Sequence, residues 1–275
     1  MKKIHKKILV GITGGTGLIG RYLIKKYSKY KFIKFKGNIL KKKQVDHWIK
    51  NSKFENIIHL AAKVPTAYVN ANYLMAKKTN YQGTKNLVNS IVKLKKNNFK
   101  WFFFASTSHV YKMSRKKLSE SSKLSPSSKY GYTKFLAEKF LKKKLPFKIC
   151  IARIFSLTHP NQHPSYAIPS IYRKIKKNKN KEIVLQNLNH YRDFCHIDDV
   201  CKAIELLCKK QEEGIYNIGS SKKTSLKSIA SYFAKEKKIL FDDSKITTSI
   251  IANISKIKKI GFKPKYNLKK ILEDF

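Results

Sequence analysis

The sequence predicts an α/β protein with a Rossmann-type, doubly wound parallel sheet and a smaller C-terminal lobe. Short apolar runs alternate with helical patterns over roughly the first 150 residues, which is typical of a parallel sheet covered by helices on both faces. A glycine-rich turn also separates the first apolar run from the first helical pattern. At 275 residues the chain is long enough to bury a full core.

The glycine-rich turn predicts a dinucleotide site. It lies between the apolar run Lys7–Thr13 and the helical pattern of Leu18–Tyr27. Its three spaced glycines allow a tight turn, close approach to a pyrophosphate and close helix–strand packing, respectively. The N-terminus of the following helix presents N–H groups and a partial positive charge to phosphates. A plain turn is the alternative. We expect cofactor contacts at Gly14, Gly15, Thr16, Gly17, Leu18, Ile19 and Gly20.

The next strand bears on the choice of cofactor. Phe32–Phe35 is the expected strand, and Asn38, just beyond it, is an expected cofactor contact. An NAD site normally has an acidic residue near the end of this strand, and there is none between Gly20 and Val45. Lys34 and Lys36 are there instead and suit a 2′-phosphate, although lysine is abundant throughout the chain. The sequence leaves NAD and NADP open.

Small residues follow the third predicted strand. Ala61 and Ala62 would let a cofactor pass close to the backbone, so we expect cofactor contacts there and at Leu60. Asn80 lies in the next predicted helix, where its amide is expected to reach backbone groups of the following strand. These elements are predicted at Lys41–Asn51 (helix), Asn56–Leu60 (strand), Ala76–Leu94 (helix) and Trp101–Ala105 (strand).

A tyrosine and a lysine mark the candidate catalytic residues. The strand Trp101–Ala105 leads into the hydroxyl cluster of Ser106, Thr107 and Ser108, and a helical pattern starts near Tyr130. Lys134 follows Tyr130 by four residues, so both side chains lie on one face of a helix. The lysine can then bias the phenol, whose ordinary pKa is about 10, towards the phenolate. Such a phenol can exchange a proton with a sugar hydroxyl or carbonyl.

The second half of the chain predicts a smaller lobe. Beyond Thr158 the regular alternation is broken by prolines and histidines. We expect domains at residues 1–157 and 158–275, partly interleaved, with one strand returning to the main sheet. The strands are predicted at Phe147–Phe155, Glu182–Leu185 and Ile215–Ile218, and the helices at Ile168–Lys177, Ile197–Lys209 and Ser225–Lys235, the last capped by Thr224 or Ser225.

The formal charge of +45 raises the question of a polyanionic partner. Nearly all of this charge is lysine spread along the chain, whereas arginine is the preferred reader of phosphates and guanine. We interpret the excess as compositional drift of the kind an AT-rich genome produces, and expect no specific nucleic-acid partner. The positive field can still attract a phosphorylated substrate.

The cysteines and the hydropathy indicate a reducing, non-membrane setting. The four cysteines form no CxxC pair, so we expect reduced core residues and no metal site. Met1–Lys3 resembles the start of a signal peptide, but the apolar run that follows is too short. No stretch approaches the roughly 18 apolar residues that span a membrane. We expect a cytoplasmic protein.

Five segments together resemble the extended short-chain dehydrogenase/reductases. The similarity is to the branch of NAD-dependent epimerase/dehydratases that act on nucleotide sugars, and it covers nearly the whole chain in the family's order. The segments are Thr13–Gly20, His59–Ala62, Ser106–Tyr111, Tyr130–Lys134 and Tyr191–Val200.

This resemblance implies roles for individual residues. Tyr130 corresponds to the family's general acid/base, and Lys134 to the lysine that lowers its pKa and holds the nicotinamide ribose. Thr107 corresponds to the hydroxyl that bonds the reacting sugar oxygen, with Ser106 beside it at the cofactor. Asn80 is similar to the asparagine that supports the cofactor site. Arg192 is similar to the arginine on the nucleotide diphosphate, the alternative being a salt bridge to a nearby aspartate.

Departures from the family pattern bear on the reaction type. Dehydratases of the family carry acidic residues just after the catalytic threonine, where this chain has Ser108 and His109, which counts against dehydration. The related fucose-synthase-like epimerase-reductases use a cysteine and a histidine, and His109 and His163 fall near those positions. A histidine pKa near 6.5 suits proton transfer, whereas a local packing role is the alternative for His109. Ser156 replaces the family's usual asparagine, which leaves recognition of the sugar open.

The resemblance implies a nucleotide-diphosphate sugar as substrate, with hydride transfer at the sugar C4, and leaves epimerisation and reduction of a 4-keto sugar open. It also implies a homodimer formed through two long helices, at about residues 73–96 and 130–144. A non-catalytic cofactor sensor on the same fold is the alternative from another class. The complete set of Thr107, Tyr130 and Lys134 argues against it, because a sensor needs no proton relay.

Overall fold

The computed structural model describes residues 7–95, 98–143, 145–242 and 247–275. Chain contacts divide the molecule into two compact units interleaved along the sequence. Unit 1 comprises Met1–Thr107, Ser128–Ala152 and Ile204–Ile215, and unit 2 comprises Ser108–Ser127, Arg153–Ala203 and Tyr216–Phe275. The domain boundary expected after residue 157 stays a prediction. The signal-like start, Met1–Lys3, lies outside the described residues.

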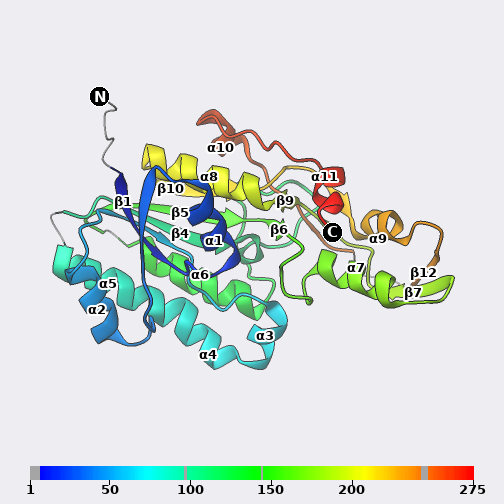
Figure 1. The fold of residues 1–275 in the computed structure, drawn as a ribbon, viewed down its shortest axis with the longest axis horizontal. Helices are drawn as coiled ribbons and strands as arrows, with labels where there is room; N and C mark the ends of the chain where they lie inside the picture. Colours follow the sequence, from blue (N-terminus) through cyan, green and yellow to red (C-terminus); the bar gives the residue numbers. More distant parts are fainter. Residues whose placement is uncertain (1–6, 96–97, 144, 243–246) are drawn as a thin grey trace. The chain divides into compact units, whose positions relative to one another are not determined.

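A six-stranded sheet has the strand order β10-β5-β4-β3-β1-β2. Four of its strands, β1, β4, β5 and β10, are labelled in Figure 1. The pairs β1·β2, β1·β3 and β3·β4 are parallel. The expected doubly wound parallel sheet is therefore confirmed. Strand order reverses between β1 and β3, and in open α/β sheets ligands bind beyond the carboxyl ends of the strands at such a point. The strands are β1 (Ile8–Thr13), β2 (Tyr30–Lys34), β3 (Asn56–His59), β4 (Trp101–Thr107), β5 (Lys148–Ile154) and β10 (Gly214–Ile218).

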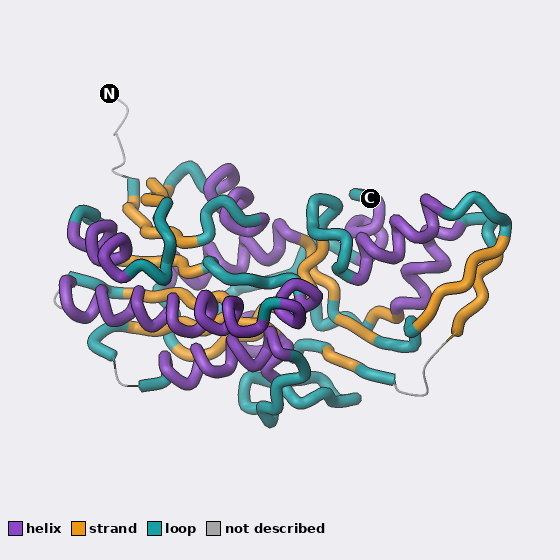
Figure 2. Tube along the Cα trace, turned by 90° about the horizontal axis from the view of Figure 1, so that it is seen from below, coloured by secondary structure: helices purple, strands orange, loops and turns teal. Residues whose placement is uncertain are grey.

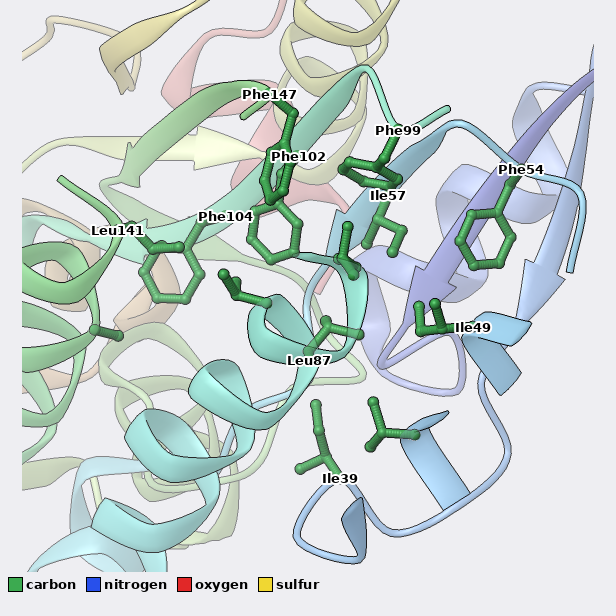
Figure 3. Packing of buried hydrophobic residues seen from close by; sticks show 14 of the residues in the cluster. Ile39, Ile49, Phe54, Ile57, Leu87, Phe99, Phe102, Phe104, Leu141 and Phe147 are labelled. Atoms are coloured by element: carbon green, nitrogen blue, oxygen red, sulfur yellow. The ribbon is translucent and has the colours of Figure 1, made fainter. Parts of the chain in front are cut away.

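The core of unit 1 lies between the sheet and the helices α2 (Lys42–Lys50), α5 (Gly83–Lys95) and α6 (Lys129–Leu141). Figure 3 shows phenylalanines of the strands, among them Phe102 and Phe104, pointing at aliphatic side chains of these helices. Four successive large side chains of β4, residues 101–104, are fully buried, as expected of a strand covered on both faces. The other face carries α1 (Leu18–Lys26) and the second half of α8 (Ile197–Lys210) (Figure 1).

The long helix predicted at Ala76–Leu94 is interrupted in the structure. The segment comprises α3 (Thr66–Ala71), α4 (Tyr73–Lys77), the π-helical turn η1 (Lys78–Gln82) and α5. Asn80 lies inside the π turn. Single π turns within α-helices are frequent at functional sites.

Unit 2 contains helices and short strands, and most of these strands form small sheets of two or three strands. Strands β7 and β12 pair in parallel. They are the two strands lying side by side at the right of Figure 2. Ser225 caps α9, because its hydroxyl accepts a hydrogen bond from the backbone N–H of Lys227. The elements not yet placed are η2 (Ser108–Val110), β6 (Ser156–Thr158), α7 (Ala167–Lys177), β7 (Glu182–Gln186), β8 (Tyr191–Arg192), β9 (Phe194–His196), β11 (Thr224–Ser225), α9 (Leu226–Ala234), β12 (Lys238–Asp242), β13 (Ser249–Ile250), α10 (Ser255–Lys259) and α11 (Leu268–Glu273).

The structure also bears on the cysteines and on the hydropathy of the helices. Cys150, Cys195, Cys201 and Cys208 are all buried and carry free thiols. Among the described residues, no helix combines the length and the apolar character that crossing a membrane requires.

Candidate active site

The glycine turn is packed directly against the end of β3. Gly14 has a φ of +70°, a conformation that side chains other than glycine rarely adopt. A methyl group on Gly14 would lie 2.6 Å from the backbone nitrogen of Ala61. One on Gly20 would lie 2.4 Å from the carbonyl oxygen of Gly14. The turn therefore needs glycine at both positions to join β1, β3 and the start of α1.

The middle glycine of the turn lies at the start of α1. Gly17 precedes α1 with an extended backbone (φ −71°), and a methyl group there would make one tight contact, 3.2 Å from the Gly14 carbonyl oxygen. The first turn of α1 has no acidic residue and no side-chain cap. Its N–H groups are thus suited to an anion such as the pyrophosphate of a dinucleotide. The uncapped N-terminus of α1, directly after the glycine turn, offers a pyrophosphate unpaired N–H groups, so the residues fit NAD(P).

Two glycine substitutions should separate these roles. We expect Gly20→Ala to lower the free energy of unfolding by about 1–3 kcal/mol, because its methyl group would overlap backbone atoms. Gly17→Ala should lower the melting temperature less than Gly20→Ala does, because its methyl group would make a single tight contact at 3.2 Å, and it should weaken dinucleotide binding at least about tenfold. Thermal unfolding and calorimetric titration with NAD⁺ and NADP⁺ measure both effects. Unchanged dinucleotide affinity of Gly17→Ala would contradict the assignment of the turn.

A chain of hydrogen bonds fixes the ends of β1 and β3. The His59 ring joins Thr13 Oγ1 (2.6 Å from Nδ1) and Thr84 Oγ1 (2.9 Å from Nε2). Thr84 donates its own proton to the Asn80 carbonyl, so its oxygen accepts from the His59 Nε2–H. Nδ1 then accepts from Thr13. Burial, with a contribution from the positive charge of Lys134, lowers the pKa of His59 to about 3, so the ring is neutral at physiological pH.

Asn80 ties two other segments together. Its Oδ1 accepts from the backbone N–H of Lys63, and its Nδ2 donates to the Lys63 carbonyl and to Thr133 Oγ1 on α6. The prediction that this amide reaches backbone groups was correct in kind. The partner is the loop after β3, however, and not the following strand. The π turn places Asn80 between this loop and α6. Because Asn80 is fully buried, these hydrogen bonds connect the two segments without competition from water.

Tyr130 and Lys134 are both buried on α6, as their spacing predicts, with 8% and 2% of their surfaces exposed. Ser128 is the N-cap residue of α6, and its hydroxyl accepts a hydrogen bond from the Gly131 N–H at 3.0 Å. Tyr130 packs in a small apolar cluster with Val69 and Ala76 of α3 and α4. Helix α6 is thereby held so that both candidate catalytic side chains face the interior of unit 1.

Lys134 lies next to β4. Its ammonium group is 4.0 Å from the centroid of the Phe104 ring. Burial lowers the pKa of Lys134 to about 7, against the opposing attraction of Glu138 one helical turn away. Glu138 is itself buried and accepts a hydrogen bond from the Ser106 hydroxyl at 2.5 Å. The lysine thus occupies the interior at the end of β4, where Ser106 and Thr107 also lie buried.

Sequence reasoning missed Glu138 as a residue of this cluster. Its position four residues after Lys134 on a helical pattern was the available signal, since oppositely charged residues at that spacing face each other. The importance of His59 as a hydrogen-bonding partner was also missed. Its two partners, Thr13 and Thr84, lie 46 and 25 residues away along the chain, and local sequence patterns do not predict such contacts.

The remaining predicted cofactor residues border the turn or the strand ends. Thr16 is exposed, Gly15 is buried, and Leu18, Ile19, Leu60, Ala61 and Ala62 are partly buried. Asn38 is exposed in the loop after β2, where its Oδ1 accepts from the Leu40 N–H and its own N–H donates to Gln44.

In unit 2, Arg192 and His109 interact electrostatically. Burial, together with the charge of Arg192, lowers the pKa of His109 to about 4. The imidazole is therefore neutral at pH 7, and the ordinary pKa near 6.5 assumed from the sequence was wrong. Ser108 is buried beside it in η2.

Among the described residues, the hydrogen bonds of Arg192 go to groups other than the aspartates of the alternative interpretation. Its Nη1 donates to the Tyr191 carbonyl and to the carbonyl and hydroxyl of Thr248. The carboxylate of Asp193 instead accepts from Ser220, Ser221 and Ala252. The exposed His163 makes a local contact, with its Nδ1 2.8 Å from the hydroxyl of Ser165.

Comparison with known proteins identifies the family of the chain. Residues 10–219 match the model of the NAD dependent epimerase/dehydratase family. The chain is 31% identical over 213 residues to a GDP-6-deoxy-D-talose 4-dehydrogenase of Aggregatibacter actinomycetemcomitans, covering 74% of this chain and 70% of that protein. It is 26% identical over 257 residues to an ADP-L-glycero-D-manno-heptose-6-epimerase of Brachyspira hyodysenteriae, covering 81% and 79%.

Solved structures of similar fold include a UDP-glucose 4-epimerase from Thermotoga maritima with UDP-glucose (TM-score 0.83, 21% identity, 97% of each chain). RMD from Pseudomonas aeruginosa, complexed with NADPH, has a TM-score of 0.85 at 20% identity over 98% of this chain and 97% of that one. The family model covers most of the chain, and the resemblance found in the sequence is confirmed: the protein belongs to the NAD-dependent epimerase/dehydratase family.

Proposed function

We propose that the protein is an NAD(P)-dependent nucleotide-sugar epimerase or 4-keto-sugar reductase. The observation that carries this proposal is the burial of Tyr130 and Lys134 on one face of α6, in the same unit as the glycine turn. Its relatives include a nucleotide-sugar epimerase and a nucleotide-sugar dehydrogenase. A protein that only senses the cofactor has no use for the buried tyrosine–lysine pair.

The chemistry divides between cofactor and chain. Bound NAD(P) supplies the hydride acceptor or donor. Tyr130, as phenolate, takes the proton of the sugar hydroxyl while the carbon is oxidised, and returns it when a carbonyl is reduced. Lys134 in its ammonium form stabilises the phenolate, and Thr107 donates a hydrogen bond to the reacting oxygen. Holding the reactants in near-attack geometry is the main contribution of the fold.

Substrate recognition follows the family pattern. We assign the diphosphate to Arg192, whose position is fixed by its bonds to Thr248. His109 and Ser108 contact the sugar, and His109 does so as a neutral imidazole. A neutral imidazole can accept a proton or donate a hydrogen bond, and neither residue supplies the carboxylate that dehydration uses. Epimerisation or reduction is therefore favoured over dehydration.

Three finer expectations belong to the same proposal. The enzyme is a homodimer that pairs through the helical segments near residues 73–96 and 130–144, whose ends at 96 and 144 lie outside the described residues. Leu74 and Met75 of α4 and Tyr132 of α6 are exposed hydrophobic side chains in these segments. The enzyme acts in the cytoplasm, and its product supplies polysaccharide synthesis.

One experiment tests the function. The purified protein is analysed by mass spectrometry for co-purifying dinucleotide and then screened with UDP-, GDP- and dTDP-sugars for hydride transfer. Tightly retained dinucleotide with interconversion of C4 epimers indicates an epimerase. Stoichiometric consumption of added reduced dinucleotide indicates a reductase. Formation of a 4-keto-6-deoxy sugar would contradict the role given to Ser108 and His109, and dinucleotide binding without any turnover would favour a sensor.

A further inference from the structure

A cleft of about 520 Å³ opens between the end of β2 and helix α2. Three lysines line it, Lys34, Lys36 and Lys43, together with the aromatic side chains of Phe35 and Trp48 and the imidazole of His47. None of the described residues that line it is acidic. The cleft therefore presents concentrated positive charge beside an aromatic wall, all within unit 1.

The cleft lies next to the glycine turn. Lys34 pairs with Ile12 in the parallel register of β1 and β2, and the Phe35 N–H donates to the Ile12 carbonyl at 2.9 Å. A methyl group on Gly15 would lie 3.5 Å from Cγ of Lys34. The Lys34 side chain thus lies over the turn that fits the pyrophosphate. In this fold the residues at the end of the second strand face the adenosine ribose of a bound dinucleotide.

The charge at this position selects between the two dinucleotides. A carboxylate bonds the two ribose hydroxyls of NAD and repels a 2′-phosphate, whereas a basic residue favours the phosphate of NADP. The first acidic residue after the turn is Asp46. Its carboxylate is already engaged by Lys42 Nζ at 2.7 Å and by Ser90 Oγ at 2.5 Å. It does not line the cleft.

The loop that carries Lys36 is held in shape. Gln44 Oε1 accepts from the Asn38 N–H at 2.7 Å, and a methyl group on Gly37 would lie 2.8 Å from the same oxygen. The Lys41 N–H bonds the Asn38 carbonyl at 2.9 Å. Lys34 on the strand, Lys36 on the loop and Lys43 on α2 thereby face one cleft from three fixed backbone positions. Such pre-organisation lowers the cost of binding an anion.

We infer that this cleft binds the 2′-phosphate of NADP through Lys34 and Lys36, with Lys43 adding to the field, so that the enzyme selects NADP over NAD. The inference rests on the proposed function, because it assumes that the glycine turn holds a dinucleotide. It adds the identity of the cofactor and the residues that choose it. An enzyme that selects NADPH is expected to favour reduction of a keto sugar, since cells keep this dinucleotide available as a reductant.

The test measures binding, not turnover. Isothermal titration of the full chain with NAD⁺ and NADP⁺, at 50 and 200 mM salt, gives the ratio of the two dissociation constants. We expect NADP⁺ to bind at least about tenfold tighter, as charge-assisted hydrogen bonds to the phosphate require. In Lys34→Ala/Lys36→Ala the ratio should fall to within about threefold of one through loss of NADP⁺ affinity alone.

A matched variant controls for the overall charge. Lys31→Ala/Lys50→Ala removes the same two charges from β2 and α2 at exposed positions that do not line the cleft, and it should keep the native ratio. Equal or tighter binding of NAD⁺ by the native chain would overturn the inference and leave the proposed function standing. So would an equal loss of NADP⁺ affinity in the control. Binding of neither dinucleotide would overturn the proposed function as well.

Discussion

Tyr130→Phe is expected to lower kcat by about 100- to 10,000-fold, the range that general acid–base catalysis contributes. The change removes one oxygen from a side chain that is 8% exposed and packed on Val69 and Ala76. The ring keeps its apolar neighbours, so we expect the melting temperature and the dissociation constant for NAD(P) to change little. Hydride transfer to or from the best nucleotide sugar of the screen is the measurement, with calorimetric titration of the dinucleotide beside it.

Tyr132→Phe is the matched control for this result. It removes the same atom from the same helix two residues away, but its side chain is 42% exposed and points away from the buried face. Turnover of Tyr132→Phe should equal that of the native enzyme. If Tyr130→Phe retained native turnover, the assignment of the acid/base would be wrong. If it lost dinucleotide binding as well, its effect would be structural and not catalytic.

The elements of the main sheet could be predicted because each is a local pattern. Within a few residues, the local sequence predicts the strands β1, β3 and β4 from their apolar runs and the turn from its glycines. The interruption of the predicted helix Ala76–Leu94 could not be read in this way. Asn80 in the π turn bonds Lys63 and Thr133, which lie 17 and 53 residues away along the chain, and a local pattern carries no information on such contacts. The same holds for the pairing of β7 with β12 in unit 2.

For the candidate site, residue types were predictable and their electrostatics were not. The spacing of Tyr130 and Lys134 places both on one helix face whatever surrounds them. Whether His109 titrates near neutral pH depends instead on burial and on Arg192, which is distant in the sequence. The ordinary pKa was therefore the wrong premise. Likewise, the role proposed for Lys34 and Lys36 in a lysine-rich chain depends on the cleft that they line together, which the sequence does not reveal.

Lys134→Met is expected to reduce turnover at least about 100-fold while making the fold more stable. The folded chain holds the pKa of this lysine at about 7, below its ordinary value of 10.5, because burial disfavours the ammonium form more than Glu138 favours it. The native protein thus keeps a charge that its own packing disfavours. Methionine has a similar shape, carries no charge and can retain the contact with the Phe104 ring.

The sign of the pH dependence distinguishes this account from a simple packing effect. Below pH 7 both the folded and the unfolded chain carry the Lys134 charge, and the desolvation cost is then at its maximum. As the pH rises from about 7 towards 10.5, the folded chain releases the proton and the cost declines. The melting temperature of Lys134→Met should therefore exceed the native value by about 3–8 °C at pH 6, and the difference should shrink steadily above pH 7.

Thermal unfolding at pH 6, 7, 8 and 9 measures this difference. Two further variants serve as controls, one for the unpaired carboxylate and one for the charge. Lys134→Met/Glu138→Gln removes the carboxylate that loses its partner, and should be at least as stable as the single variant at pH 6. Lys134→Arg keeps the charge, and should show no gain in stability at any pH. A destabilised Lys134→Met and double variant at pH 6 would mean that the buried ammonium holds the fold together. The expected gain in stability of Lys134→Met would mean that the proposed proton chemistry of Tyr130, and not the stability of the fold, accounts for a lysine at this position.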